Sequence, residues 1–238
     1  IRRNISIYMI VRLAFLGGIL SLLFSLFSFH LLDNGWWGAS SAGPIEETGK
    51  IFAMLAVART AQYRYKLNGL LIGAAVGVGF SAFETAGYVL RTYTAGSVVG
   101  TAEVLSSLEP EVALAVGMHK GAKAMEDVLV VRGLLSPLGH IVWSSIAGFA
   151  MWRTIRGRKF HWRMLVDEDF IRLLLIPVIL HMLWNAPFEL PFFGKYLILG
   201  IAGWFICFSL IQEGLKELKL EQNEERKKRG MVASALEN

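Results

Sequence analysis

The residues of this chain that could do chemistry are ionisable and imidazole side chains inside apolar stretches. They form four groups: Glu46, Glu47 and Lys50; Glu84; His140; and His181 with Asn185. A charge at mid-bilayer costs at least a few kcal/mol and usually faces a cavity or a partner. Carboxylates and imidazoles in a partly dry pocket suit hydrolysis, because a carboxylate can take a proton from water and an imidazole can stabilise an oxyanion or protonate a leaving amine.

Two hydrolytic arrangements are compatible with these residue types. In the first, Glu47 or Glu46 activates water, and His140 and His181 stabilise the tetrahedral intermediate. In the second, both histidines and Glu84 bind zinc with one open position for water, and Glu47 is the general base. The sequence contains no HExxH, GxSxG or glycine-rich phosphate motif that would indicate a competing chemistry.

Each group also has a purely structural interpretation. Pro44 and the two glutamates after it would make a favourable helix start, with Lys50 as their salt-bridge partner. Lys50 could equally tune or neutralise a catalytic glutamate pair. A single histidine is often a packed core residue, and Asn185 lies one turn from His181, where its amide could orient the imidazole.

The elements that position these groups follow from composition. The chain has 238 residues, 54% hydrophobic and 18% charged, whereas a soluble domain has about 45–50% apolar and about 25% charged residues. Apolar stretches run over 13–32, 44–58, 68–90, 133–152, 170–189 and 195–212. Because a spanning helix takes ~20 residues, we predict an all-α, polytopic transmembrane helix bundle of about six spans.

The loops predict the orientation of this bundle. Basic clusters fall on one side of a six-span chain: Arg2 and Arg3, Arg59 to Lys66, Arg153 to Arg163, and Lys216 onward. By the positive-inside rule this side is the cytoplasm, with both termini there. The net charge of +5 is thereby explained by topology, and a nucleic-acid partner is not expected. We read the first stretch as a retained helix, because it exceeds the apolar region of a cleaved signal peptide.

The predicted domain layout is simple. Residues 1–213 form one integral membrane domain, and 214–238 form a charged cytoplasmic tail. The non-cytoplasmic segment 91–132 is too mixed for a standard span, so we expect interfacial helices over 97–108 and 111–131, split by Pro110.

This topology places all four chemical groups in the outer half of the membrane, on four different helices. Independent structural accidents would scatter over both halves. The small residues of the third stretch, such as Gly69, Gly73 and Gly77, would let it approach its neighbours closely and gather the groups around one cavity.

Three short motifs carry a family resemblance. Glu46-Glu47-Thr-Gly-Lys50 matches the EExxK motif of the PrsW family of intramembrane proteases, and Phe80-Ser-Ala-Phe-Glu84 matches its FxxxE motif. His181-Met-Leu-Trp-Asn185 is similar to the family's HxxxD motif, with Asn where Asp is usual. An HxxxN ending is found in the related CAAX prenyl endopeptidases and bacteriocin-processing proteins, whose first two motifs, EExxxR and FxxxH, differ from those of this chain.

The resemblance covers residues 43–189 and implies cleavage of membrane-anchored proteins, with anti-sigma factors as the known example, near the extracytoplasmic face of a prokaryotic plasma membrane. It implies these site residues: Glu46 and Glu47 as catalytic groups, Glu84, His140 and His181 completing the site, Phe80 as a motif residue, and Asn185 supporting His181. Asn185 argues against a role that needs a negative charge. The family is classed with metalloproteases and its relatives with glutamic proteases, so both arrangements stay open.

Two other functions use the same residues. A proton-coupled transporter or channel would use the acidic and imidazole groups as a relay, but the cytoplasmic halves of the predicted spans contain almost no ionisable residues. A non-catalytic homologue would bind a partner or confer immunity, and the change from Asp to Asn at position 185 is the one feature in its favour. The membrane peptidase is the favoured interpretation.

Overall fold

The computed structural model is all-helical, as predicted. It describes residues 5–32, 38–57 and 63–236, with side chains up to 229, and these residues contain no strand. The long elements are α1 (Ile7–Arg12), a π-helical turn (Leu13–Gly17), α2 (Gly18–Leu31), α3 (Ala42–Val57), α4 (Lys66–Val104), α5 (Pro110–Leu135), α6 (His140–Ile155), α7 (Glu168–Asn185) and α8 (Gly194–Leu236).

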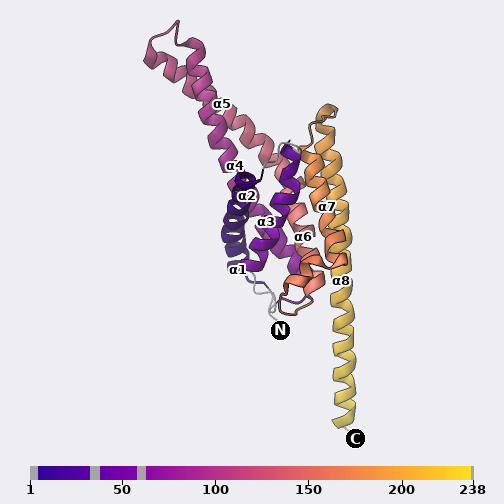
Figure 1. Cartoon of the computed structure of the whole chain (residues 1–238). Coiled ribbons are helices and arrows are strands. Elements are labelled where there is room, and N and C mark those ends of the chain that lie inside the picture. Colours follow the sequence, from indigo (N-terminus) through magenta and orange to yellow (C-terminus); the bar gives the residue numbers. More distant parts are fainter. Residues whose placement is uncertain (1–4, 33–37, 58–62, 237–238) are drawn as a thin grey trace.

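Helix α6 lies at the centre of the bundle, and nearly all of its residues are buried. It packs against α3, α4, α7 and α8 (Figure 1). Helices α2 and α8 leave large apolar side chains exposed, including Leu23 and Phe27 on α2 and Ile198 and Phe205 on α8. A bundle with a packed centre and an apolar surface is typical of a membrane protein.

Small residues bring α4 against its neighbours, as the sequence predicts. A Cβ added at Gly73 would overlap the carbonyl of Ser144 on α6, and one at Gly79 would overlap the carbonyl of Ala14. The backbones of α4 and α6 are therefore in direct contact, which large side chains would prevent.

The segment 91–132 differs in part from its prediction. Helix α4 does not end near Arg91 but continues to Val104, and α5 begins at Pro110 and returns alongside it. The break at Pro110 is confirmed, whereas a separate helix over 97–108 is wrong because the helix is continuous through 91–96. Figure 1 shows the two helices as a hairpin that projects beyond the bundle.

Glycines on both helices let the α4–α5 hairpin pack closely. Gly96 lies against Gly121, and Gly100 against Gly117. The hairpin is therefore a pair of helices in backbone contact rather than two separate surface helices.

Four helical stretches of the described chain are long and apolar enough to cross a membrane: Ile7–Leu31, Lys66–Val104, Pro110–Ile155 and Pro191–Arg229. Helices α3 and α7 are not among them, since α3 has 16 residues and the 18 residues of α7 include three charged ones, Glu168, Asp169 and Arg172. The structure thus supports an integral membrane protein with four candidate spans, fewer than the six predicted.

Helix α1 begins at the end of the bundle from which the long C-terminal part of α8 extends, and the hairpin projects from the opposite end (Figure 1). Helix α8 is unbroken to Leu236, so the predicted tail continues a bundle helix. The predicted basic residues Arg2, Arg3 and Arg59 lie outside the described residues.

Candidate active site

Helix α3 carries two carboxylates and a lysine that are all buried. Its spacing places Lys50 one turn after the glutamates, with Lys50 Nζ 2.7 Å from Glu47 Oε1 and 4.0 Å from Glu46 Oε2. The side chains of Lys50 and Glu47 are 0% exposed. The salt bridge of the structural interpretation therefore forms, but deep in the bundle, where it contacts two histidines as well.

His181 approaches both glutamates from α7. Its Nδ1 lies 3.0 Å from Glu47 Oε1, and its Nε2 lies 3.7 Å from Glu46 Oε2. The ring stacks on Trp143, with centroids 4.3 Å apart and planes inclined by 24°. The imidazole is thus held on one face by an aromatic ring and at Nδ1 by a carboxylate, with Nε2 directed toward Glu46.

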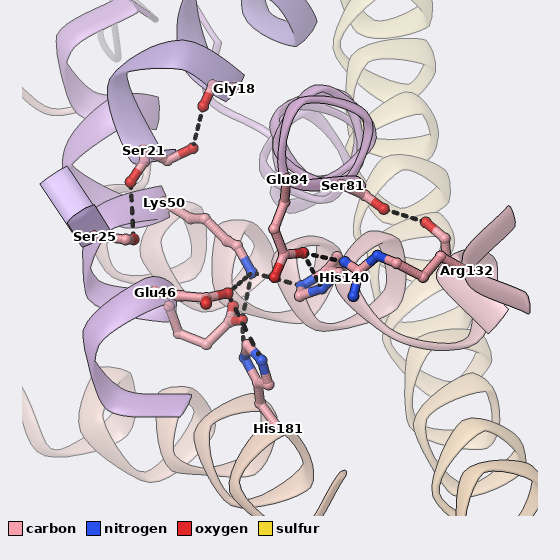
Figure 2. Close-up of polar contacts among 12 residues, drawn as sticks. Gly18, Ser21, Ser25, Glu46, Lys50, Ser81, Glu84, Arg132, His140 and His181 are labelled. Carbon is pink, nitrogen blue, oxygen red and sulfur yellow. Dashed lines mark hydrogen bonds and ion pairs between the residues drawn. The ribbon is translucent and has the colours of Figure 1, made fainter. Parts of the chain in front are cut away.

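His140, the first residue of α6, joins α3 to α4. Its Nδ1 lies 3.1 Å from Lys50 Nζ, and its Nε2 lies 3.0 Å from Glu84 Oε2 (Figure 2). An ammonium group can only donate hydrogen bonds, so Nδ1 accepts from Lys50 and the Nε2–H donates to Glu84. The hydrogen-bond partners thereby define the tautomer of His140.

Arg132, near the end of α5, completes the network and was missed by the sequence reasoning. Its Nη2 lies 2.5 Å from Glu84 Oε2, its Nε donates to Thr85 Oγ1 over 3.1 Å, and its guanidinium lies 4.3 Å from the centroid of the Tyr88 ring. The signal that could have found it is Glu84 itself, a carboxylate in an apolar stretch that requires a cationic partner.

The remaining predicted residues have different surroundings. The Phe80 ring lies under the Lys50 ammonium, 4.3 Å from Nζ to the centroid. Asn185 does not hydrogen-bond to His181, since both ring nitrogens of that histidine face the glutamates of α3. Asn185 lines two cavities instead, so its predicted support of His181 is not what its position favours.

Two cavities meet at the site. The larger, of about 610 Å³, is lined by residues of α2, α3, α4 and α7 that include Glu46, Glu84 and His181. The smaller, of about 280 Å³, lies toward α5 and α8. Residues lining both are Arg132, His140, Trp184 and Asn185. Glu46 thus borders a cavity, whereas Glu47 is packed behind it.

One set of these side chains could hold a metal ion. Glu46, His140 and His181 each offer a ligand atom within 4.8 Å of the others, and Glu46 Oε2 is buried without a hydrogen-bond partner. Two imidazoles and a carboxylate form a typical catalytic zinc set. The carboxylate in this set is Glu46 rather than the predicted Glu84, because Glu84 is held by His140 Nε2 and Arg132.

Buried carboxylates and imidazoles beside a cavity in a helical membrane bundle are the groups that an integral membrane hydrolase requires. A model of the PrsW family of intramembrane metalloproteases matches residues 6–211. The chain therefore belongs to this family and is a membrane protease whose substrates are membrane-embedded proteins. Neither the curated proteins nor the solved structures compared with it gave a match.

Proposed function

We propose that this protein is an intramembrane endopeptidase that cleaves membrane-anchored proteins near the extracytoplasmic face, with Glu46, His140 and His181 at the reaction centre. The observation that carries the proposal is the meeting of these three side chains, from three helices, beside a cavity of about 610 Å³. They lie far apart in the sequence, and their residue types are those that peptide hydrolysis requires.

The two glutamates have different roles in this proposal. Both glutamates have an Oε2 that is buried without a hydrogen-bond partner, but only Glu46 borders the cavity, so its carboxylate can accept a proton from water there. Glu47 binds Lys50 and His181 through Oε1. We therefore assign Glu46 to the contact with water and Glu47 to the positioning of His181.

Metal binding would use Glu46, His140 and His181. A bound divalent metal such as zinc would supply Lewis-acid polarisation of the scissile carbonyl and activation of water. The residues behind this set are those expected around a metal site, because ligating histidines commonly donate their second N–H to a carboxylate. Glu84 has this relation to His140, and Glu47 has it to His181.

The substrate path follows the two cavities. Arg132 and Asn185 border both, and each has N–H groups that can donate to peptide carbonyls. A segment that enters the larger cavity and continues into the smaller one would pass His140. We infer that the substrate is held in extended form there, with Asn185 as a hydrogen-bond donor to its backbone.

The proposed topology keeps six spans. Helix α3, with 16 residues, is about 24 Å long, and α7, with 18, is about 27 Å, slightly less than the ~30 Å hydrocarbon core. Both pack among the other helices of the bundle, α3 against α2, α6 and α7, and α7 against α3, α6 and α8 (Figure 1), which supports their place inside the bilayer. Residues 1–213 would form the membrane domain and 214–238 the tail.

The orientation follows from charge. Arg153 lies in the last turn of α6 and Arg156 and Arg158 follow it, at the end away from the hairpin, and Lys216 and Lys219 lie on the part of α8 that extends there. We place this end in the cytoplasm of a prokaryote and the tip of the hairpin at the extracytoplasmic surface.

An anti-sigma-factor-like substrate agrees with cleavage on the extracytoplasmic side. The His181 to Asn185 spacing supports a distant relation to the CAAX prenyl endopeptidases.

A cleavage assay tests the proposal. Wild-type protein, Glu46→Gln and His181→Ala are each placed in liposomes with a single-pass substrate tagged at both ends. We expect both variants to lose at least ~100-fold in rate, while Glu103→Gln, a change at the exposed hairpin tip, retains it. Chelation should abolish wild-type cleavage, and added zinc should restore it. Undiminished cleavage in both variants would overturn the assignment.

A further inference from the structure

The ammonium of Lys50 lies among the atoms that would bind the metal. It is 3.1 Å from His140 Nδ1, 4.0 Å from Glu46 Oε2 and 2.7 Å from Glu47 Oε1. The side chain is 0% exposed. Figure 2 shows its nitrogen between the side chains of Glu46, Glu84 and His140. A cation of the protein itself thus lies beside two of the three candidate ligands.

Because of the hydrogen bonds of His140, Lys50 and a metal ion cannot both bind its ring at the same time. Its Nε2–H is directed at Glu84, so Nδ1 is the ring nitrogen left to bind a metal. The lone pair of Nδ1 already accepts a hydrogen bond from Lys50 and can serve one cation at a time. A divalent ion near Nδ1 would also be repelled by the ammonium, because low-dielectric surroundings strengthen the repulsion of like charges.

We propose that Lys50 holds the cation position of the metal-free enzyme and must leave His140 Nδ1 before a divalent metal binds, so that this lysine weakens metal affinity and makes loading reversible. The inference rests on the metal site of the proposed function. It does not depend on the substrate or on the rate of cleavage.

The structure provides partners for the displaced ammonium. The Phe80 ring lies 4.3 Å from Nζ and the Glu47 carboxylate 2.7 Å from it, and neither contact uses His140. The lysine side chain is flexible enough to keep both while it leaves Nδ1. This avoids an unpaired buried charge and gives a role to Phe80, which lies one turn before Glu84 on α4.

The charges of the network favour tighter binding when Lys50 is neutralised. The carboxylates of Glu46, Glu47 and Glu84 are opposed by Lys50 and Arg132, which leaves one net negative charge when both histidines are neutral. A divalent ion brings the sum to one positive charge. Without the lysine charge the same ion brings the sum to zero, so loading no longer creates an excess positive charge in a buried site.

Zinc titration of the full-length protein in nanodiscs tests the inference. Metal is stripped, and the zinc dissociation constant is measured by competition with a fluorescent chelator for wild type, Lys50→Gln and Lys50→Met. Lys195→Met is the matched control, because Lys195 is also buried, at 2% exposed, but pairs with Glu189. We expect the dissociation constant to fall at least tenfold in both Lys50 variants and to change less than twofold in the control.

Thermal unfolding gives a readout that is independent of activity. Zinc should raise the Tm of Lys50→Gln more than that of wild type, because tighter binding adds more stability. If Lys50→Met does not fold, Lys50→Gln decides the question, since its shorter, neutral side chain can still donate to Glu47 without placing a charge beside His140. Zinc affinity that is unchanged or weaker in folded Lys50→Gln overturns the inference.

The location of the metal is tested with Glu46→Gln. Zinc that binds this variant as tightly as it binds wild type lies elsewhere, and the inference is then wrong. It is also wrong if no variant binds zinc. The peptidase proposal is judged separately by the cleavage assay, because chelator-insensitive cleavage that still requires Glu46 would leave a glutamic mechanism standing.

Discussion

The two ends of the bundle bury different kinds of side chain, although α3, α4, α6 and α7 run through both. Toward the hairpin, these helices bury Glu46, Glu47, Lys50, His140 and His181. Toward the other end, they bury an apolar cluster that includes Met54, Ile72, Met151, Trp152 and Ile155. One set of helices therefore supplies both a packed core and a polar site, separated along their length.

The difference indicates which end of the bundle stabilises the folded state and which end contributes little to its stability. In the apolar cluster, close packing stabilises the helix contacts, since dispersion between well-packed helices is a main driving force inside a bilayer. A buried network of charges stabilises little, because desolvation offsets the attraction. Apart from Tyr63, the residues of this cluster have no ionisable side chain, which disfavours the proton relay. Activity and stability should accordingly respond to mutations at opposite ends.

The largest expected effect is on activity at the polar end. Glu46→Gln should lower the cleavage rate by about 10²- to 10⁴-fold, because the amide cannot accept a proton from water or act as an anionic ligand. The free energy of unfolding should change by less than about 1 kcal/mol, since Glu46 Oε2 has no hydrogen-bond partner to lose and Lys50 keeps its shorter ion pair with Glu47. Cleavage assays and thermal unfolding measure the two quantities, and a parallel loss of both would indicate a structural role.

The reverse result is expected at the apolar end. Met54→Ala should lower the free energy of unfolding by about 2–5 kcal/mol, because the fully buried side chain leaves a cavity. Cleavage per folded molecule should stay within about twofold of wild type. Denaturant titration in mixed micelles, combined with activity normalised to folded protein, checks this, and a selective loss of activity would show that the two ends are coupled.

A smaller effect is expected for Arg132, which joins the hairpin to the site. Arg132→Gln should lower the cleavage rate about tenfold, as is common for residues that orient a ligand from behind. Arg132→Lys should lose less, because it keeps the charge beside Glu84 but not the second contact, to Thr85. Measurements of kcat and KM at several pH values distinguish this positioning role from a role in substrate binding. Loss of a substrate contact would raise KM alone.

The smallest effect is expected at the tip of the hairpin. Lys120 and Glu103 form an exposed ion pair there, and exposed pairs contribute about 0–1 kcal/mol. Lys120→Ala should therefore leave both the Tm and the cleavage rate nearly unchanged. A large loss of cleavage in this variant, with normal stability, would extend the functional region from the bundle to the hairpin.

Much of the fold could be predicted because apolar stretches mark most helices of the bundle, and the charges of the loops indicated α3, which is short and carries three ionisable residues. The shared depth of Glu46, Glu47, Glu84, His140 and His181 predicted that they lie at one level of the bundle, and the small residues of α4 favoured their gathering around one cavity. The extent of α4 could not, because its continuation to Val104 depends on packing against α5 through Gly96 and Gly100. No local pattern in the sequence encodes that contact.

The rotation of each helix about its own axis also could not be predicted from the sequence. Successive residues of a helix point about 100° apart, so depth does not decide whether Glu46 or Glu47 borders the cavity. It also does not show that Glu84 is held by Arg132, a residue 48 positions away in the chain. These assignments require the three-dimensional packing of α3, α4 and α5.

The contact between α4 and α6 limits how this protein can evolve. A side chain at Gly73 or Gly148 would overlap backbone of the opposing helix, which would separate Glu84 from His140. Gly87 and Gly133, by contrast, have no atom within 4 Å of an added Cβ. Substitution at Gly87, which lines the larger cavity, can therefore change the wall of that cavity while the distance between Glu84 and His140 is kept.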